Sequence, residues 1–268
     1  MKSRLPWFAL LLVGATFTGT VSSERQVSRH ALADGAASRP SAPEPAPKTP
    51  VEAAARRLHA MHGMVVSCPG AGAEWGRDAM VEAMRELRRL GVDAVGTHPY
   101  AGIREDGSVP QWFDLSQPPA WITRPIREGR ELGMRVMVKP HLGYWGSRFS
   151  WRGEIEFDSD EKWARFFEQY RQWIVRVAEL SRGADLFVVG TELDRTLQHE
   201  KEWRHIIAEV RQVFDGPVTY SANWTDYQRV PFWDALDVIG IHAYFPLVDP
   251  DQEPTREAIE AGWTRVSG

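Results

Sequence analysis

Between residues 63 and 241, six short apolar runs alternate with amphipathic helical stretches, and this rhythm constrains the fold more than any other feature. Glycine ends most of the helical stretches, as expected just after a helix C-terminus. A buried strand after each helix implies parallel βα units. The predicted strands cover residues 63–67, 92–96, 134–139, 186–191, 217–221 and 236–241, and the predicted helices cover residues 76–90, 121–132, 158–182 and 200–214.

The apolar residues of these helices recur at helical spacing, which predicts one buried face on each. Leu90 is expected to lie on the buried face of the first helix. The helix over residues 158–182 is expected to begin at Asp158, with Glu161 completing a capping box. Trp163 and Trp173 follow the apolar spacing of that helix and are assigned to the core.

Six βα units fit either an open doubly wound sheet or an incomplete eight-stranded barrel. No G-x-G-x-x-G follows the first strand, so the dinucleotide-binding sheet loses its main support. Polar and aromatic residues lie just beyond several strands, and in a barrel all such strand ends meet at one rim. We therefore predict an α/β fold, a (β/α)8 TIM barrel truncated after about six βα units. The residues at the rim are His98, Tyr100, Lys139, His141, Glu192, Asn223, Trp224, His242 and Tyr244.

The N-terminal segment differs in composition from the rest of the chain. Residues 1–21 have the pattern of a secretory signal peptide, with Lys2 and Arg4 before an apolar run over residues 7–15. That run is shorter than the roughly 20 apolar residues of a membrane span. No A-x-A cleavage site follows it, so an uncleaved N-terminal membrane tether is the alternative. We expect a secreted or periplasmic protein.

Residues 22–55 are rich in Ala, Ser and Pro and are predicted to be a disordered linker. The folded domain is therefore assigned to residues 56–268. A net charge of −4 gives no electrostatic case for nucleic acid binding. Cys68 is the only cysteine, which excludes an internal disulfide and a cysteine-rich metal site, and we expect it to be buried near the first strand. We expect a monomer.

Several motifs together resemble the glycoside hydrolase family of TIM barrels that includes β-mannanases, family 113 of the retaining clan A. The resemblance runs from about residue 63 to residue 263. Its most specific parts are Val-Lys-Pro-His at 138–141, Trp-Arg-Gly-Glu-Ile at 151–155, Gly-Thr-Glu-Leu at 190–193, Trp-Arg at 203–204, Tyr-Ser-Ala-Asn-Trp at 220–224, and residues 236–247.

The resemblance implies retaining hydrolysis of a β-1,4-linked polysaccharide or oligosaccharide, with β-mannan as the expected substrate. It implies that Glu192 is the general acid/base and that Tyr244 hydrogen-bonds the nucleophile. This chemistry needs neither cofactor nor metal. An acid favoured at a helix N-terminus is the structural alternative for Glu192, and a packed aromatic is the alternative for Tyr244. The expected sugar contacts are His98, Tyr100, Lys139, His141, Trp151, Asn223, Trp224, His242 and Tyr244.

A retaining glycosidase needs two carboxyl groups about 5–5.5 Å apart. The family places its nucleophile, a Glu, after strand seven, and strands seven and eight are not found in this sequence. Glu154, Glu156 and Asp226 are available acids, but none is assigned as the nucleophile. We therefore expect the N-terminal part of a longer protein, and a 268-residue product that is poorly stable and inactive.

Two other functions remain open at this point. Histidines near three strand ends, with Glu192, would fit a metal-dependent barrel hydrolase using His98, His141 and His242. Lys139 would repel a cation there, which argues against it. A non-catalytic carbohydrate-binding barrel would equally explain the aromatic rim and the missing nucleophile.

Overall fold

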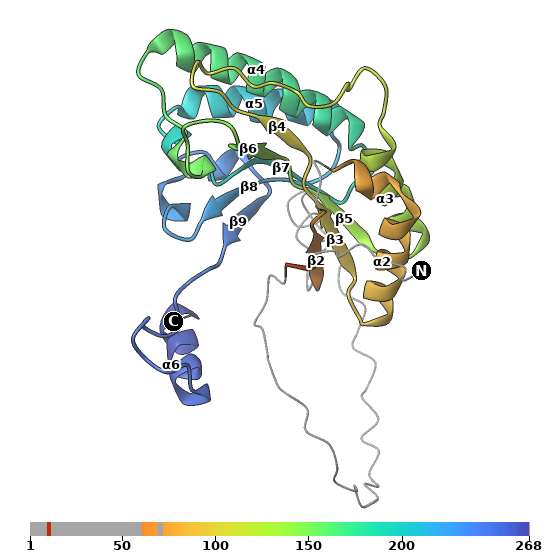
Figure 1. Ribbon diagram of the computed structural model, residues 1–268, viewed down its shortest axis with the longest axis vertical. Helices are drawn as coiled ribbons and strands as arrows, with labels where there is room; N and C mark the ends of the chain where they lie inside the picture. The colour runs from red at the N-terminus through yellow and green to blue at the C-terminus, as the bar shows by residue number, and fades with distance from the viewer. Residues whose placement is uncertain (1–9, 12–60, 69–71, 268) are drawn as a thin grey trace, which may run out of the picture.

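A computed structural model describes residues 10–11, 61–68 and 72–267. Apart from the two-residue strand β1 (Leu10–Leu11), the predicted signal peptide and linker lie outside the described residues. The rest forms an α/β half-barrel of six parallel strands with helices packed against it, which confirms the predicted class (Figure 1). The six strands are β2 (Gly63–Val66), β3 (Ala94–Thr97), β5 (Arg135–Val138), β7 (Leu186–Thr191), β8 (Val218–Asn223) and β9 (Val238–His242).

The sheet order is β1-β2-β3-β5-β7-β8-β9. Strands β2 to β9 run parallel, and β1 pairs antiparallel with β2. Because these six strands run parallel, their carboxyl ends lie along one rim, as the sequence predicted. Each observed strand falls within two residues of a predicted one.

Among the helices of the described residues, α2 to α5 cover the sheet and α6 lies apart from it (Figure 1). Helices α2 and α3 pack near β3 and β5, and helices α4 and α5 pack against each other near β7. No helix of the described chain is long and apolar enough to cross a membrane. The helices are α2 (Asp78–Arg89), α3 (Ala120–Glu131), α4 (Asp160–Leu180), α5 (Glu200–Val213) and α6 (Arg256–Ser267). The 3-10 turns are η1 (Ala73–Gly76), η2 (Arg152–Glu154), η3 (Asp194–Thr196), η4 (Tyr227–Arg229) and η5 (Trp233–Ala235).

Two local predictions about the helices are wrong. Leu90 is 71% exposed, because α2 ends at Arg89 and Leu90 lies beyond the last buried turn. Helix α4 begins at Asp160, and the capping residue is Ser159, whose hydroxyl accepts a hydrogen bond from the backbone N–H of Lys162. A serine cap fits the helix N-terminus as well as an aspartate does.

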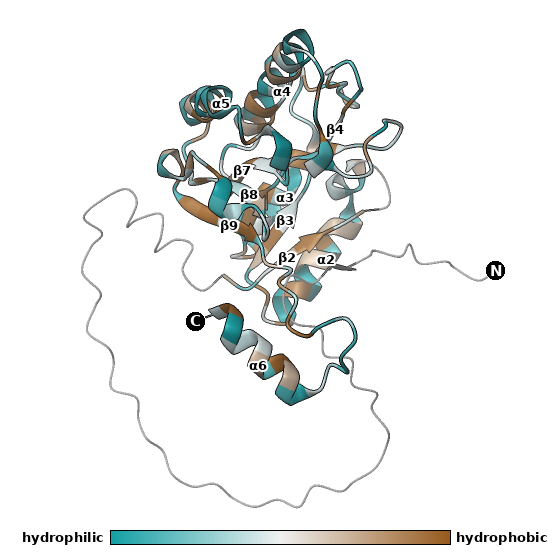
Figure 2. Cartoon of the chain, turned by 90° about the vertical axis from the view of Figure 1, so that its left-hand side faces the viewer, coloured by the Kyte–Doolittle hydropathy of each residue, from teal (hydrophilic) through white to brown (hydrophobic). Residues whose placement is uncertain are grey.

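The core lies between the sheet and the helices, and apolar residues follow the strands while hydrophilic ones mark the outer side of α5 (Figure 2). All six residues of β7 are buried, as the apolar run predicted. Trp163 and Trp173 are both core residues, as predicted. The buried hydroxyl of Tyr170 donates to the carbonyl oxygen of Val189 at 2.8 Å, which ties α4 to β7 two residues before the strand ends.

Gly190 lets two large aromatic residues approach the end of β7. A Cβ at this position would lie 2.6 Å from the ring of Trp203 and 2.8 Å from the ring of Tyr220. Both rings belong to the fully buried core, so neither can move away easily. We therefore expect Gly190→Ala to lower the free energy of unfolding by about 1–3 kcal/mol. Thermal denaturation followed by circular dichroism measures this, and an unchanged Tm would contradict the packing argument.

A second, two-stranded sheet was not predicted. Strands β4 (Tyr100–Gly102) and β6 (His141–Gly143) pair in parallel just beyond the ends of β3 and β5. Their register sets Tyr100 directly beside His141. Two of the predicted rim residues are therefore fixed on neighbouring strands instead of in loops.

Candidate active site

Glu192 follows β7 directly, in a backbone conformation that a side chain rarely adopts. Its φ is +51°, and no other non-glycine residue of the described chain has a positive φ. The left-handed region costs a non-glycine residue free energy and is concentrated at functional sites. The backbone N–H of Glu192 donates to the carbonyl oxygen of Ser221 on β8 at 2.8 Å, which helps to hold this conformation. The strain marks position 192 as one where the orientation of the side chain matters.

The carboxylate of Glu192 is held by two other side chains. One oxygen, Oε1, contacts Nδ1 of His242, and the other, Oε2, lies 3.4 Å from a guanidinium nitrogen of Arg152. On the far side of the imidazole, Nε2 of His242 lies 2.5 Å from Nζ of Lys139. Because an ammonium group can only donate, Nε2 accepts and Nδ1 carries the proton that faces Glu192. Lys139, His242 and Glu192 therefore form one hydrogen-bonded series across β5, β9 and β7.

The charges around Glu192 favour its ionised form. Burial raises the pKa of Glu192, but the hydrogen bond from His242 and the charges of His242, Arg152 and Lys139 together outweigh it, so the pKa is lowered. Burial at the end of an apolar strand would by itself raise the pKa of the carboxyl group, as suits a general acid. Here the pKa is lowered instead, because the charges of Arg152 and Lys139 and the hydrogen bond from His242 reach the carboxylate from three other segments.

The pKa values of Lys139 and His242 are shifted mainly by burial. Lys139 is 8% exposed, and burial lowers its pKa from 10.5 to about 8, although Glu192 opposes the shift. Burial likewise lowers the pKa of His242, which the Glu192 carboxylate opposes. Burial thus favours the neutral form of both side chains.

Two further histidines line the next part of the rim. The rings of His98 and His141 stack with centroids 5.1 Å apart. Nδ1 of His141 lies 3.2 Å from Arg152, and Nε2 of His98 lies 3.2 Å from the hydroxyl of Ser67. Burial lowers the pKa of His98 to about 4, so this ring is neutral at neutral pH. The other ring nitrogens, Nδ1 of His98 and Nε2 of His141, are buried without a hydrogen-bond partner among the described residues.

The remaining predicted residues lie around this centre. Asn223 ends β8 and pairs in register with His242. Trp224 packs edge-on against Phe245 at 5.8 Å, and the largely exposed ring of Tyr244 lies 6.1 Å from the ring of His242. Trp151 lies over Gly153, immediately beside Arg152 in the segment that follows β6. The structure therefore brings the predicted residues together along one rim, and their individual roles stay predictions.

Arg152 and Asp194 were not predicted from the sequence as residues of the site. Arg152 bridges His141 and Glu192, yet it had been quoted only as part of the 151–155 motif. Its position next to Trp151 was the available signal. Asp194 is buried, and burial together with the nearby Asp226 raises its pKa to about 7. Asp226 in turn accepts a hydrogen bond from the hydroxyl of Thr225 at 2.5 Å.

Glu154 and Glu156, two of the three acids considered earlier, are bonded to side chains other than Glu192. Glu154 accepts a 2.6 Å hydrogen bond from the hydroxyl of Ser150, and Glu156 forms a 2.8 Å ion pair with Arg195. Within residues 61–68 and 72–267, no group of three or more His, Cys, Asp or Glu side chains is arranged to hold a metal ion. The predicted metal-hydrolase alternative therefore has no site in the described chain.

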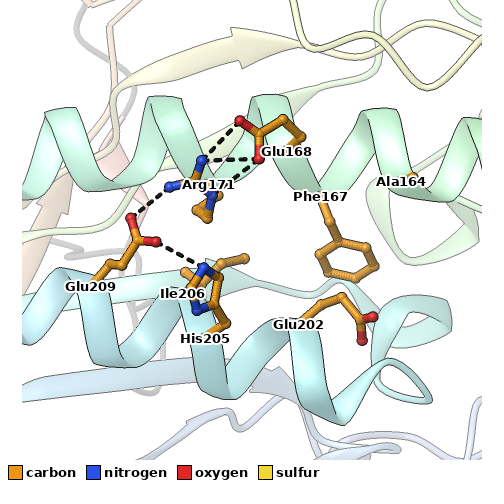
Figure 3. Close-up of a pocket in the computed structure, with 8 residues that line it drawn as sticks. All are labelled: Ala164, Phe167, Glu168, Arg171, Glu202, His205, Ile206 and Glu209. Atoms are coloured by element: carbon orange, nitrogen blue, oxygen red, sulfur yellow. Dashed lines mark hydrogen bonds and ion pairs between the residues drawn. The ribbon is translucent and has the colours of Figure 1, made fainter.

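A pocket elsewhere lies between α4 and α5 (Figure 3). Several of its charged side chains pair with one another: Arg171 pairs with Glu168 at 2.8 Å and with Glu209 at 2.6 Å, and His205 also reaches Glu209. All of its lining residues come from the two helices and none from the strand ends. It is therefore part of the contact between the helices and separate from the rim.

Comparison with known proteins assigns the family. The family model described as Glycoside Hydrolase Family 113 matches residues 67–265, which contain every residue of the rim. The chain belongs to glycoside hydrolase family 113. The resemblance inferred from the motifs is thereby confirmed.

Solved structures of family 113 have the same fold. A β-mannanase from Alicyclobacillus acidocaldarius, AaManA, in complex with ManMIm, is 28% identical, with a TM-score of 0.62 over 70% of this chain and 62% of that chain. A family 113 β-1,4-mannanase solved as a complex is 26% identical, with a TM-score of 0.63 over 77% of this chain and 68% of that one. The chain thus spans about 62% of the length of the first relative. No curated protein sequence matches the chain.

Proposed function

We propose that this family 113 chain supplies the acid/base part of the active site of a β-mannanase, which hydrolyses β-1,4-linked mannan with retention of configuration. The observation that carries the proposal is Glu192 itself, which has a strained backbone at the end of β7 and a carboxylate held between Arg152 and His242. The substrates named for the two structural relatives support mannan as the polysaccharide.

Glu192 would act twice in this reaction. As an acid it protonates the glycosidic oxygen of the leaving sugar, and as a base it then deprotonates the water that releases the glycosyl-enzyme intermediate. The lowered pKa of Glu192 suits the second step, which needs a carboxylate. For the first step, a bound sugar displaces water from the rim, and this added burial raises the pKa towards the protonated form.

The nucleophile is proposed to lie outside residues 1–268. Glu154, Glu156 and Asp226 are each bonded to another side chain, and among the described residues no hydrogen bond or ion pair links any of them to Glu192. A second carboxyl group about 5–5.5 Å from Glu192 is required for retention. We therefore expect the isolated 268-residue chain to be inactive on mannan, and the full-length enzyme, meaning the product of the complete reading frame that contains residues 1–268, to be active.

The test uses the full-length enzyme and a panel of β-mannan, cellulose and chitin oligosaccharides. Proton NMR during the first minutes of hydrolysis should show the β-anomer of the product appearing first. Initial appearance of the α-anomer would contradict the retaining mechanism. Faster cleavage of the glucose- or glucosamine-based oligosaccharides would contradict mannan as the substrate.

We also propose that the protein is exported, secreted or periplasmic, and works as a monomer. The charged and then apolar pattern of residues 1–21 supports export. N-terminal sequencing of the protein from its native cells would distinguish a cleaved signal from a retained membrane tether.

A further inference from the structure

Four aromatic side chains form a continuous cluster on the small sheet of β4 and β6, away from Glu192. Tyr100 lies 6.0 Å from Trp112 and 5.2 Å from Trp145, measured between ring centroids. Trp112 and Trp145 lie 5.9 Å from each other, and Tyr144 stacks on Trp145 at 5.7 Å. We call these four residues the aromatic platform. Neither tryptophan was singled out from the sequence.

The platform faces solvent. Trp112 is 38% exposed and Trp145 is 58% exposed, although most large aromatic residues of the described chain belong to the core. Neither indole N–H has a hydrogen-bond partner among the described residues. Exposing two neighbouring indole faces to water costs free energy and contributes nothing to folding. Exposed apolar patches of this kind mark binding surfaces.

Glycines and hydrogen bonds hold the two indoles in place. A Cβ on Gly102 would lie 2.9 Å from Trp112, and a Cβ on Gly143 would lie 2.5 Å from Trp112 and 2.7 Å from Trp145. The indoles therefore lie close over the backbone of β4 and β6, in space that only glycine leaves free. The backbone N–H of Gly102 also donates to the carbonyl oxygen of Pro110 at 2.8 Å, which anchors the segment that leads to Trp112. The surface is thus preorganised.

The platform is connected to the candidate active site by direct contacts. Tyr100 packs edge-on against His141 at 5.6 Å, and the two residues are register partners on β4 and β6. His141 contacts Arg152 at 3.2 Å, and Arg152 contacts Glu192 at 3.4 Å. One extended ligand could therefore lie along the rim and touch both the platform and the carboxylate.

We propose that Trp112 and Trp145, with Tyr100 beneath them, bind pyranose units of the polysaccharide several sugars away from the bond that is cleaved. The proposal rests on the proposed function. A pyranose ring has an apolar C–H face that matches an indole face, and its equatorial hydroxyls can accept from the free indole N–H groups. The platform would thereby select long substrates over short ones.

The experiment compares Trp112→Ala and Trp145→Ala with the unchanged full-length enzyme on manno-oligosaccharides of increasing length and on mannan. Each loss of a stacking ring should lower kcat/KM on the long substrates by about two- to tenfold. The shortest oligosaccharide that is cleaved should be hydrolysed at the unchanged rate, because it does not reach the platform. Trp145→Phe should retain most of the activity on long substrates, since it keeps an aromatic face.

Trp263→Ala is the matched control, because Trp263 is 57% exposed on α6 and belongs to no ring contact of the platform. This control should behave as the unchanged enzyme on every substrate. Equal losses on short and long substrates would assign the platform tryptophans to structure only. No loss on any substrate would overturn the proposal as well.

Binding separates failure of this inference from failure of the proposed function. If the full-length enzyme does not hydrolyse mannan, the proposed function is wrong, and migration through a mannan-containing native gel still tests the platform. Retarded migration that Trp145→Ala abolishes would support sugar binding without catalysis. Migration that neither tryptophan substitution changes would overturn the platform.

Discussion

Glu192→Gln should remove nearly all mannan hydrolysis by the full-length enzyme, with kcat falling by a factor of about 100 to 10,000. Glutamine has almost the same shape as glutamate but cannot protonate the leaving oxygen or deprotonate water. The single amide oxygen can accept from Arg152 or from the Nδ1–H of His242 but not from both, so one of the two contacts is lost. The shape of the side chain is kept, so the fold should survive and the oligosaccharide should still bind. Steady-state kinetics, with calorimetric binding of a manno-oligosaccharide, measures both quantities.

A substrate with a good leaving group makes this experiment sharper. An aryl β-mannoside with an acidic phenol needs little protonation, so its first step should be nearly unaffected by Glu192→Gln, while the second step remains slow. Glu154→Gln and Glu156→Gln are matched controls, because both side chains lie in the segment that contains Arg152 and are bonded elsewhere. A loss in either control as large as that of Glu192→Gln would contradict the assignment.

Lys139→Met should lower kcat/KM on the order of 100-fold and at the same time stabilise the protein. Without the ammonium group, Nε2 of His242 loses its donor and Glu192 loses a nearby positive charge, so the imidazole and the carboxylate are held less firmly in position. The buried charge of Lys139 is also removed. Since burial lowers its pKa from 10.5 to about 8, removing it should raise the free energy of unfolding at pH 7 by about 1–3 kcal/mol.

The pH dependence of stability provides an independent check. Between pH 8 and pH 10.5 the unfolded chain keeps the proton of Lys139 while the folded chain has released it, so the stability of the unchanged protein rises with pH in this window. Lys139→Met lacks this rise, and its advantage in Tm should shrink from pH 7 to pH 10. Lys162→Met, which breaks a more exposed ion pair with Asp158 at 2.7 Å, should show neither effect. A lower Tm for Lys139→Met at pH 7 would contradict the argument.

Much of the fold could be predicted because it depends on periodic patterns. The six parallel strands follow from apolar runs separated by amphipathic helices, and the burial of β7 follows from its six apolar or small residues. The small sheet could not be found in the same way, because β4 and β6 have three residues each, too few for a period to appear. Leu90 was misplaced because periodicity does not say at which residue a helix ends.

The site residues that lie at strand ends could be predicted from the sequence, and those that lie in loops could not. Lys139, Glu192 and His242 each come directly after or at the end of a strand, so the parallel topology brings them together. Arg152 reaches Glu192 from a 3-10 turn whose position no local pattern predicts. For that reason the direction of the pKa shift of Glu192 could not be predicted either, since the strand alone indicates burial, whereas Arg152 comes from a different segment.

The left-handed backbone at position 192 can mislead consensus design and stability-guided engineering of this protein. Glycine adopts that conformation without penalty, so an optimisation that rewards relaxed backbone geometry alone would favour glycine there. The resulting variant would keep the same barrel wall but lose its chemistry, and Arg152 and Lys139 would lose the carboxylate that offsets their charge. A library built on this scaffold should therefore hold codon 192 fixed and seek its gains elsewhere.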